Sequence, residues 1–259
     1  MTDCIDLNSD LGEGFGVYSL GDDDSMLNLV SSVNIACGFH AGDPCIMSNV
    51  AKKAKQRDIA IGAHPSFFDL WGFGRREIKG HTNDEIKQLI IYQVGALQAI
   101  ANSVGHKVTH IRAHGALGNM SDNDTELAEI ISSSIKLVDP ELAYMTRSGS
   151  IADNVAAKAG QHVIRQVFAD RAYEDNGTLV SRSKPGAVIH DPEIAAERVI
   201  KMVNDQAIET LSGKKIQQCI DTICVHGDTP ASIKMAEIIR TRLENNGIEI
   251  RSYAKKHHS

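Results

Sequence analysis

The sequence predicts an α/β protein, a single-domain β/α barrel built on seven parallel strands. Short apolar runs typical of buried strands alternate with amphipathic helical patterns along the whole chain. Polar residues follow almost every run, and 259 residues is an ordinary length for one barrel domain. This alternation requires parallel strands with helical crossovers, which occur in barrels and in doubly wound open sheets. We favour the barrel because it gathers all its strand ends at one mouth.

Seven apolar runs are predicted to be the barrel strands. They cover residues 4–8, 33–36, 59–63, 108–113, 142–146, 163–167 and 222–225. An eighth run, at 248–253, could close the barrel or lie outside it. No linker or low-complexity stretch divides the chain, so we expect one domain over residues 1–253 and a flexible tail at 254–259.

Helix-capping residues lie between the predicted strands. Spacing typical of a capping box begins at Thr82, Ser121 and Ser150, and a proline follows a capping residue at Asp191 and at Thr229. The segment after Thr82 carries apolar residues at a spacing close to 3.6, which gives a helix one apolar face to place against a sheet.

Composition excludes several functional classes. The formal net charge is -6, from 33 acidic and 27 basic residues, and no basic block exceeds a pair before the C-terminus. This balance argues against a nucleic-acid or membrane-surface protein. The five cysteines lack CxxC spacing, and the N-terminus lacks the basic and apolar regions of a signal peptide. We therefore expect a cytoplasmic protein with reduced cysteines.

Four histidines, His40, His64, His114 and His226, each follow a strand-like run. Because residues two apart on a strand share a face, Asp10 is expected at the same mouth as the first three. An imidazole changes protonation near neutral pH, and a neighbouring carboxylate can orient it. Asp10, His40, His64 and His114 are therefore the predicted catalytic residues, without an assignment of base or acid.

Parity also predicts a polar barrel interior. Asp6 and Asn8 share a strand face with Asp10, and His110 shares a strand face with Arg112. The apolar residues between them would then pack against the helices.

Small residues precede two of the histidines and are expected to leave room for a pocket. They are Ala36, Gly38, Ala60 and Gly62. A carboxylate with two histidines would suit a catalytic divalent ion that keeps an open position. No HExxH or HxxxH spacing is present, so the sequence leaves a metal open.

Two further segments carry polar residues toward the predicted mouth. In SFFDLWGFGRR (66–76), a glycine pair precedes Arg75 and Arg76, which could bind a carboxylate or phosphate; a solvated arginine pair is an equal alternative. The stretch 168–191 is long for a βα connection and carries Asp170, Arg171 and Arg182. We expect a lid or hairpin there, with an ordinary surface excursion as the alternative.

Several strings together resemble one known family, LamB/YcsF, in order and over nearly the whole chain. They are DLNSDLGE (6–13), NIACGFHAGD (34–43), AIGAHP (60–65), DLWGFGRR (69–76), HGAL (114–117), FADRAYEDNGTLVSRS (168–183), GAVIHDP (186–192) and TICVHGDTP (222–230). The resemblance implies a seven-stranded β/α barrel similar to those of glycoside hydrolases and polysaccharide deacetylases. It also implies a hydrolase acting with 5-oxoprolinase subunits B and C in the ATP-dependent opening of 5-oxo-L-proline to L-glutamate. ATP would be used through those partners, and no GxxxxGK[ST] string occurs here.

The resemblance, with the parity argument, also implies substrate-binding residues. They are Asn8, Glu13, Asp43, Arg75, Arg112, Asp170, Arg171, His226 and Asp228. The chain departs from the family pattern at Ser9, where a cysteine is expected, and in RAHGALGN (112–119), where KPHGALYN is expected. Arg112 keeps the positive charge of a lysine but cannot readily release a proton, and Gly118 lacks an aromatic ring. If the family uses those groups in chemistry, this chain would be slower or accept another ring; if they only position substrate, activity should survive.

Two other functions remain open from the sequence. One is a stand-alone metal-dependent deacetylase or amidohydrolase, suggested by the aspartate and histidine set. The other is a non-catalytic scaffold role, suggested by the altered RAHGALGN block.

Overall fold

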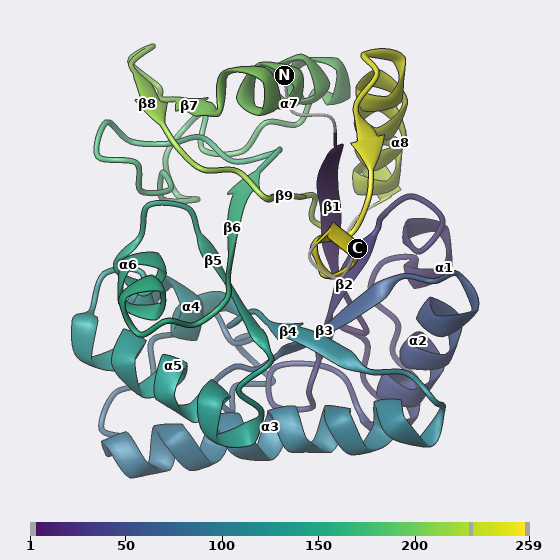
Figure 1. Cartoon of the computed structure of the whole chain (residues 1–259), viewed down its shortest axis with the longest axis vertical. Coiled ribbons are helices and arrows are strands. Elements are labelled where there is room, and N and C mark those ends of the chain that lie inside the picture. The colour runs from purple at the N-terminus through teal and green to yellow at the C-terminus, as the bar shows by residue number, and fades with distance from the viewer. Residues whose placement is uncertain (1–3, 228–229, 257–259) are drawn as a thin grey trace.

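A closed barrel of seven parallel strands forms the centre of the molecule (Figure 1). The structure is a computed structural model that describes residues 4–227 and 230–256. The barrel strands are β1 (Cys4–Leu11), β2 (Ser32–Ala36), β3 (Ala60–His64), β4 (Val108–Ile111), β5 (Ala143–Arg147), β6 (Val163–Phe168) and β9 (Thr222–Cys224). Each pairs with the next in this order, and β9 pairs back with β1. The predicted barrel with seven strands is confirmed.

Helices surround the barrel and bury its outer face (Figure 1). The longer ones are α2 (Pro44–Gln56), α3 (Asn83–Ser103), α5 (Thr125–Val138), α6 (Ile151–Lys158), α7 (Pro192–Asp205) and α8 (Pro230–Asn245), and the short ones are α1 (Asp23–Met26), α4 (Gly115–Ser121) and α9 (Tyr253–Lys256). Leu7, Ile35 and Ile61 point outward into one core with helix residues such as Val94 and Leu97. None of the helices in the described part of the chain is both long and apolar enough to cross a membrane.

The helix caps agree with the sequence except at one position. Thr82 forms a full capping box with Glu85, and Ser150 and Asp191 cap α6 and α7. Ser121 instead ends α4, because Asp124 accepts the hydrogen bond from the first turn of α5. The predicted cap at Thr229 lies outside the described residues.

The C-terminal run lies outside the closed barrel. β10 (Glu249–Ile250) pairs only with the beginning of β1, at Cys4 and Ile5. Residues 254–256, expected to belong to a flexible tail, are helical as part of α9, and residues 257–259 lie outside the described part.

A small antiparallel hairpin between α7 and β9 was not predicted. It consists of β7 (Ala207–Glu209) and β8 (Lys215–Gln217). Each strand has three residues and β8 is largely exposed, so its sequence carries almost no apolar pattern.

The barrel interior is polar, as parity predicted. Asp6, Asn8, Asn34, His110 and Thr222 form what we call the buried network, and all are almost fully buried. The Asn8 amide donates to Thr222, the Asn34 amide donates to Asn8, and the His110 ring contacts the Asn34 oxygen at 3.0 Å. The network therefore ties four of the strands together across the interior.

The space beside Gly62 is not the pocket that the sequence predicted. A Cβ atom on Gly62 would collide with the ring of His110. Glycine is needed there because the imidazole of the buried network fills the space.

Candidate functional site

A cavity of about 330 Å³ opens where the β-strands end. Its lining is rich in charged and polar side chains. The lining residues are Asp10, Glu13, Arg75, Arg112, His114, Gly115, Asn119, Phe168, Arg171, Leu179, Ser181, Arg182, His226 and Gly227. Of the predicted catalytic residues, Asp10 and His114 line this cavity, whereas His40 and His64 are buried and do not.

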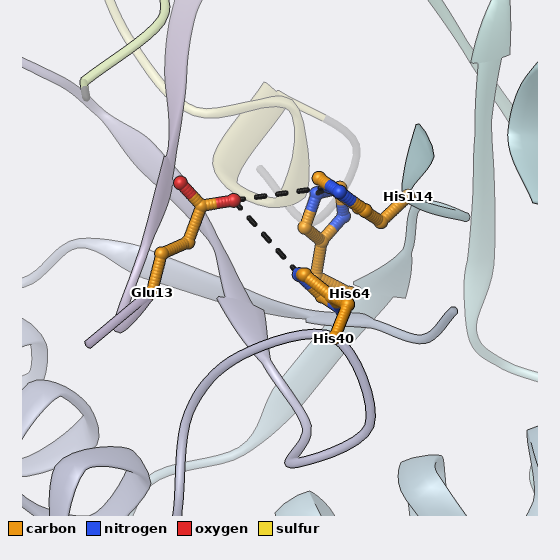
Figure 2. A group of neighbouring side chains, drawn as sticks. All are labelled: Glu13, His40, His64 and His114. Atoms are coloured by element: carbon orange, nitrogen blue, oxygen red, sulfur yellow. Dashed lines mark hydrogen bonds and ion pairs between the residues drawn. The ribbon is translucent and has the colours of Figure 1, made fainter. Parts of the chain in front are cut away.

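One part of this site is a group of four side chains that we call the histidine cluster: Glu13, His40, His64 and His114 (Figure 2). They come from the ends of β1 to β4, which are neighbours in the barrel. One ligand atom from each lies within 4.8 Å of the others, so the group could hold a metal ion. Glu13 Oε1 is 3.8 Å from both His40 Nε2 and His114 Nδ1.

The rings of the cluster are held in different ways. His64 Nδ1 contacts the Arg112 carbonyl oxygen at 2.7 Å, and His114 Nε2 contacts the Phe73 carbonyl oxygen at 2.8 Å. His40 stacks on His114 at 3.8 Å and an interplanar angle of 7°. Both ring nitrogens of His40 are buried without a hydrogen-bond partner.

The loop after β3 is shaped to fit these rings. Phe73 has a φ of 53°, a backbone conformation that residues other than glycine rarely adopt. Its neighbour Gly74 also has positive φ, and a Cβ there would lie 2.8 Å from both His114 Cδ2 and His40 Cβ. The strained loop thus presents the Phe73 carbonyl to His114, and strain of this kind often occurs at functional sites.

Electrostatics keep Asp10 charged and two of the imidazoles neutral. Burial alone would raise the pKa of Asp10, but the adjacent His64 and Arg112 hold this pKa well below its usual range. Asp10 Oδ2 lies 3.3 Å from His64 Nε2 and 3.9 Å from Arg112 Nη1. Burial lowers the pKa of both His40 and His114 well below that of a free histidine, and the neighbouring imidazoles add to the effect.

The imidazole of His226 also lines the cavity, at the ends of β6 and β9. His226 Nδ1 is 2.6 Å from Asp170 Oδ2, and the Arg182 guanidinium lies 3.3 Å from His226 Nε2. Burial would raise the pKa of Asp170, but the adjacent His226 lowers it. Because the anionic carboxylate accepts from Nδ1–H, the Nε2 lone pair of a neutral His226 faces the cavity, where the Arg182 guanidinium donates to it.

The predicted arginines have different roles. Arg75 and Arg112 line the cavity, and Arg112 Nε donates to Gln166 at 2.9 Å. Arg76 instead pairs with Asp69 beside the loop. Arg171 donates to carbonyls within the 168–191 segment and so holds that segment together. This segment contributes part of the cavity lining, as the predicted lid would.

Asn8 and Asp43, two of the predicted substrate-binding residues, do not line the cavity. Asn8 belongs to the buried network, where its amide is already hydrogen-bonded. Asp43 caps α2 by accepting from the amides of Cys45 and Ile46, so its carboxylate serves the helix instead of a ligand. Asp228 lies outside the described residues.

Several lining residues were missed because no local pattern marks them. Asn119 lies on α4, and Leu179 and Ser181 lie in the irregular 168–191 segment. Only the folded chain brings them beside Arg112. Gly118 adjoins a small side chamber of about 40 Å³, and a Cβ there would lie 2.6 Å from the Ala113 carbonyl oxygen.

Known proteins resemble this chain in both sequence and structure. The LamB/YcsF family model matches residues 5–258. The A subunit of 5-oxoprolinase from Rhodopseudomonas palustris (strain ATCC BAA-98 / CGA009) is 53% identical over 250 residues, which are 96% of this chain and 98% of that one. The lactam utilization protein from Thermus thermophilus has a TM-score of 0.92 at 39% identity, covering 96% of this chain and all of that one. A GH20 catalytic module of a pneumococcal exo-beta-D-N-acetylglucosaminidase shares the fold alone, with a TM-score of 0.54 at 10% identity, over 91% of this chain and 83% of that one.

Proposed function

The chain belongs to the LamB/YcsF family, and from this premise we propose that it is the A subunit of a 5-oxoprolinase, a hydrolase that opens 5-oxo-L-proline to L-glutamate. The observation that carries the proposal is the nearly full-length match to a relative named as the A subunit of that enzyme. The match to a lactam utilization protein agrees with a cyclic amide as substrate.

The cavity has the chemistry that such a substrate needs. A volume of about 330 Å³ lies at the small end of the range for ligand sites and suits one small ring. Arg75, Arg112 and Arg182 place guanidinium groups on its lining, where they can bind the carboxylate of 5-oxoproline.

We assign proton transfer to the two ends of the cavity. The anionic Asp10, beside the histidine cluster on the cavity lining, takes the proton from the attacking water. The water oxygen bonds to the lactam carbonyl carbon, the C–N bond breaks, and protonated His226 donates from Nε2 to the leaving nitrogen. Asp170 stabilises the imidazolium form of His226 and fixes its ring.

Arg112 acts as a positioning group in this scheme. Its guanidinium is held by Gln166 and by the ring of Phe168, and it lies near Asp10. Because an arginine retains its proton, this arrangement supports a role in binding charge, and the expected lysine is not required for proton transfer.

The complete reaction would need partners and ATP. We propose that subunits B and C consume the ATP and activate the lactam, and that this chain hydrolyses the activated ring. All five cysteines are unpaired, which supports placing the reaction in the cytoplasm.

Reconstitution tests the proposed function. The full chain, its cognate subunits B and C, ATP and 5-oxo-L-proline should together form L-glutamate, and omission of the chain should stop its formation. No glutamate from a B and C pair that is active with the A subunit of a relative would contradict the proposal. His162 is exposed and distant from the cavity lining, so His162→Asn serves as a control that should retain turnover.

The same assay separates the two alternatives. A His226→Asn complex with full turnover would support a scaffold role, because the proposed acid would then be unnecessary. Hydrolysis of acetylated or cyclic amides by the isolated chain, abolished by a chelator, would support a stand-alone amidohydrolase.

A further inference from the structure

Two imidazoles of the histidine cluster, those of His64 and His114, face each other through one ring nitrogen each. A neutral imidazole carries one N–H. A carbonyl oxygen only accepts, so the contacts with Arg112 and Phe73 place the N–H of His64 on Nδ1 and that of His114 on Nε2. His64 Nε2 and His114 Nδ1, 2.9 Å apart, therefore both present lone pairs. Such a contact is repulsive unless something positive lies between the two nitrogens.

His64 and His114 each make a hydrogen bond to a backbone carbonyl oxygen of the kind that metal-binding histidines make. Histidines that bind metals almost always donate the other ring N–H to a carboxylate or backbone carbonyl, which fixes the ring orientation. His64 and His114 both do so, and one of the carbonyls comes from the strained residue Phe73.

Glu13 and His40, the two other members of the cluster, lie close to the space between His64 Nε2 and His114 Nδ1. Glu13 Oε1 lies 3.8 Å from His114 Nδ1, and His40 Nε2 lies 3.8 Å from that carboxylate oxygen. A shared proton would relieve the contact between His64 and His114, and Asp10 Oδ2, 3.3 Å from His64 Nε2, would also accept it. Such a proton would leave both buried nitrogens of His40 without a partner.

From these contacts we infer that Glu13, His40, His64 and His114 form a binding site for one divalent first-row transition metal of the zinc class. Imidazole nitrogens with one carboxylate suit such ions. His64 Nε2, His114 Nδ1 and Glu13 are the three fixed ligands. Glu13 and His114 line the cavity, so a position beside them is open to water or substrate.

Donor separations are compatible with this assignment. In a tetrahedral site with metal–nitrogen bonds of about 2.0–2.1 Å, ligand atoms lie about 3.3 Å apart. The separations of 2.9 Å between His64 and His114 and 3.8 Å between His114 and Glu13 bracket that value. Small side-chain shifts would therefore suffice.

His40 has a distinct place in the site. Its ring is parallel to that of His114, so their in-plane lone pairs do not converge on one ion in the observed orientation. Its ring makes no hydrogen bond, and rotation toward Glu13 would break none. We assign it as a fourth ligand that joins by ring rotation.

Metal content tests the inference without reference to turnover, so its outcome is independent of the proposed reaction. The full chain is purified without a polyhistidine tag, and its metals are measured by plasma mass spectrometry. After removal of metal with a chelator, Zn²⁺ is titrated in competition with a chromophoric chelator, and Co²⁺ serves as a spectroscopic probe. We expect one equivalent of Zn²⁺ per chain, a Co²⁺ spectrum of mixed nitrogen and oxygen ligands, and a higher Tm with Zn²⁺.

Matched variants locate the ion. Glu13→Gln and His114→Gln should each weaken Zn²⁺ binding by at least about 10-fold, and His40→Gln should weaken it less. His226→Gln is the control, because His226 lies in the same cavity beside a carboxylate but outside the cluster. Its Zn²⁺ affinity should match that of the wild type.

Three results would overturn the inference. They are the absence of saturable binding of Zn²⁺ or Co²⁺, equal affinity in Glu13→Gln and the wild type, and a loss in His226→Gln as large as in His114→Gln. Nitrogen NMR showing both nitrogens of His64 protonated at neutral pH in the presence of Zn²⁺ would identify a shared proton instead. If His114→Gln does not fold, Glu13→Gln decides the matter, since glutamine keeps the size of the side chain.

Discussion

The buried network and the histidine cluster lie within the same barrel, on some of the same strands, yet they differ in how their polar atoms are satisfied. In the network, Asp6 accepts hydrogen bonds from Ser31, Ser32 and Thr222. In the cluster, both nitrogens of His40 have no hydrogen-bond partner.

This difference distinguishes polar groups that stabilise the fold from polar groups that bind a ligand or take part in a reaction. A fully bonded interior network fixes side chains and strand register, because any displacement would leave a buried group unpaired. Unpaired buried groups are costly, and they persist where a ligand or a reaction uses them. We therefore expect changes in the network to affect stability, and changes at the cavity to affect turnover.

The largest effect on turnover is expected from Glu13→Gln. The substitution preserves size and removes the charge that faces His40 and His114. Glutamate formation by the reconstituted complex should fall by about 10²–10⁴-fold. Chemical unfolding should show almost unchanged stability, since glutamine fills the same space as the buried Glu13 side chain. A large loss of stability would mean that the cluster is structural like the network.

Asp170→Asn should have the next largest effect. Asparagine keeps the shape but loses the charge that stabilises protonated His226. Turnover should fall by about 10²-fold, and KM should change little. Unaltered turnover in this variant would remove His226 from the mechanism.

Low pH should lower the free energy of unfolding through His110 of the buried network. Burial, with added repulsion from charged neighbours, lowers the pKa of His110 to about 3. An unfolded chain binds a proton at this residue near pH 6.5, so between pH 6.5 and 3 the unfolded state holds more protons and stability falls as pH falls. Between pH 7 and 4 the wild type should lose about 2–4 kcal/mol more than His110→Gln, measured by urea unfolding. Parallel pH curves for the two proteins would contradict this account.

Thr222→Val tests how much one hydroxyl of the buried network contributes to stability. Valine has a similar shape but can neither donate to Asp6 nor accept from Asn8. Stability should fall by about 1–3 kcal/mol, because buried partners are left unpaired. Turnover per folded complex should be retained, and a severe loss would blur the distinction between the two regions.

Asp43→Ala should give the smallest effect. The carboxylate caps α2, so its removal should cost about 1 kcal/mol of stability. Turnover should be unchanged, with the measurement made below the Tm of the variant. A raised KM would instead restore Asp43 as a substrate-binding residue.

The sequence predicted what periodicity and strand order determine. Parity placed Asp10 close to His64 and His114, because neighbouring parallel strands end together, and their side chains do meet there. It could not separate Asn8 from Asp10, which share a face and differ only in depth. It could not show that Asp43 caps α2, because a cap and a ligand are both polar residues near a strand end.

Other features depend on contacts between distant segments. The pairing of His226 with Asp170 joins residues 56 positions apart, and no local sequence pattern predicts it. The same is true of the Phe73 carbonyl on His114, which requires positive φ in a loop. Three-residue strands such as β7 and β8 are too short to carry a pattern.

The most direct test of the central claim compares Glu13→Gln with Thr222→Val in one experiment. Glutamate formation by each reconstituted complex is measured beside the free energy of unfolding of each chain. We predict that Glu13→Gln loses turnover with little loss of stability, and that Thr222→Val loses stability with little loss of turnover. Full turnover in the Glu13→Gln complex would contradict the claim that the histidine cluster carries the chemistry.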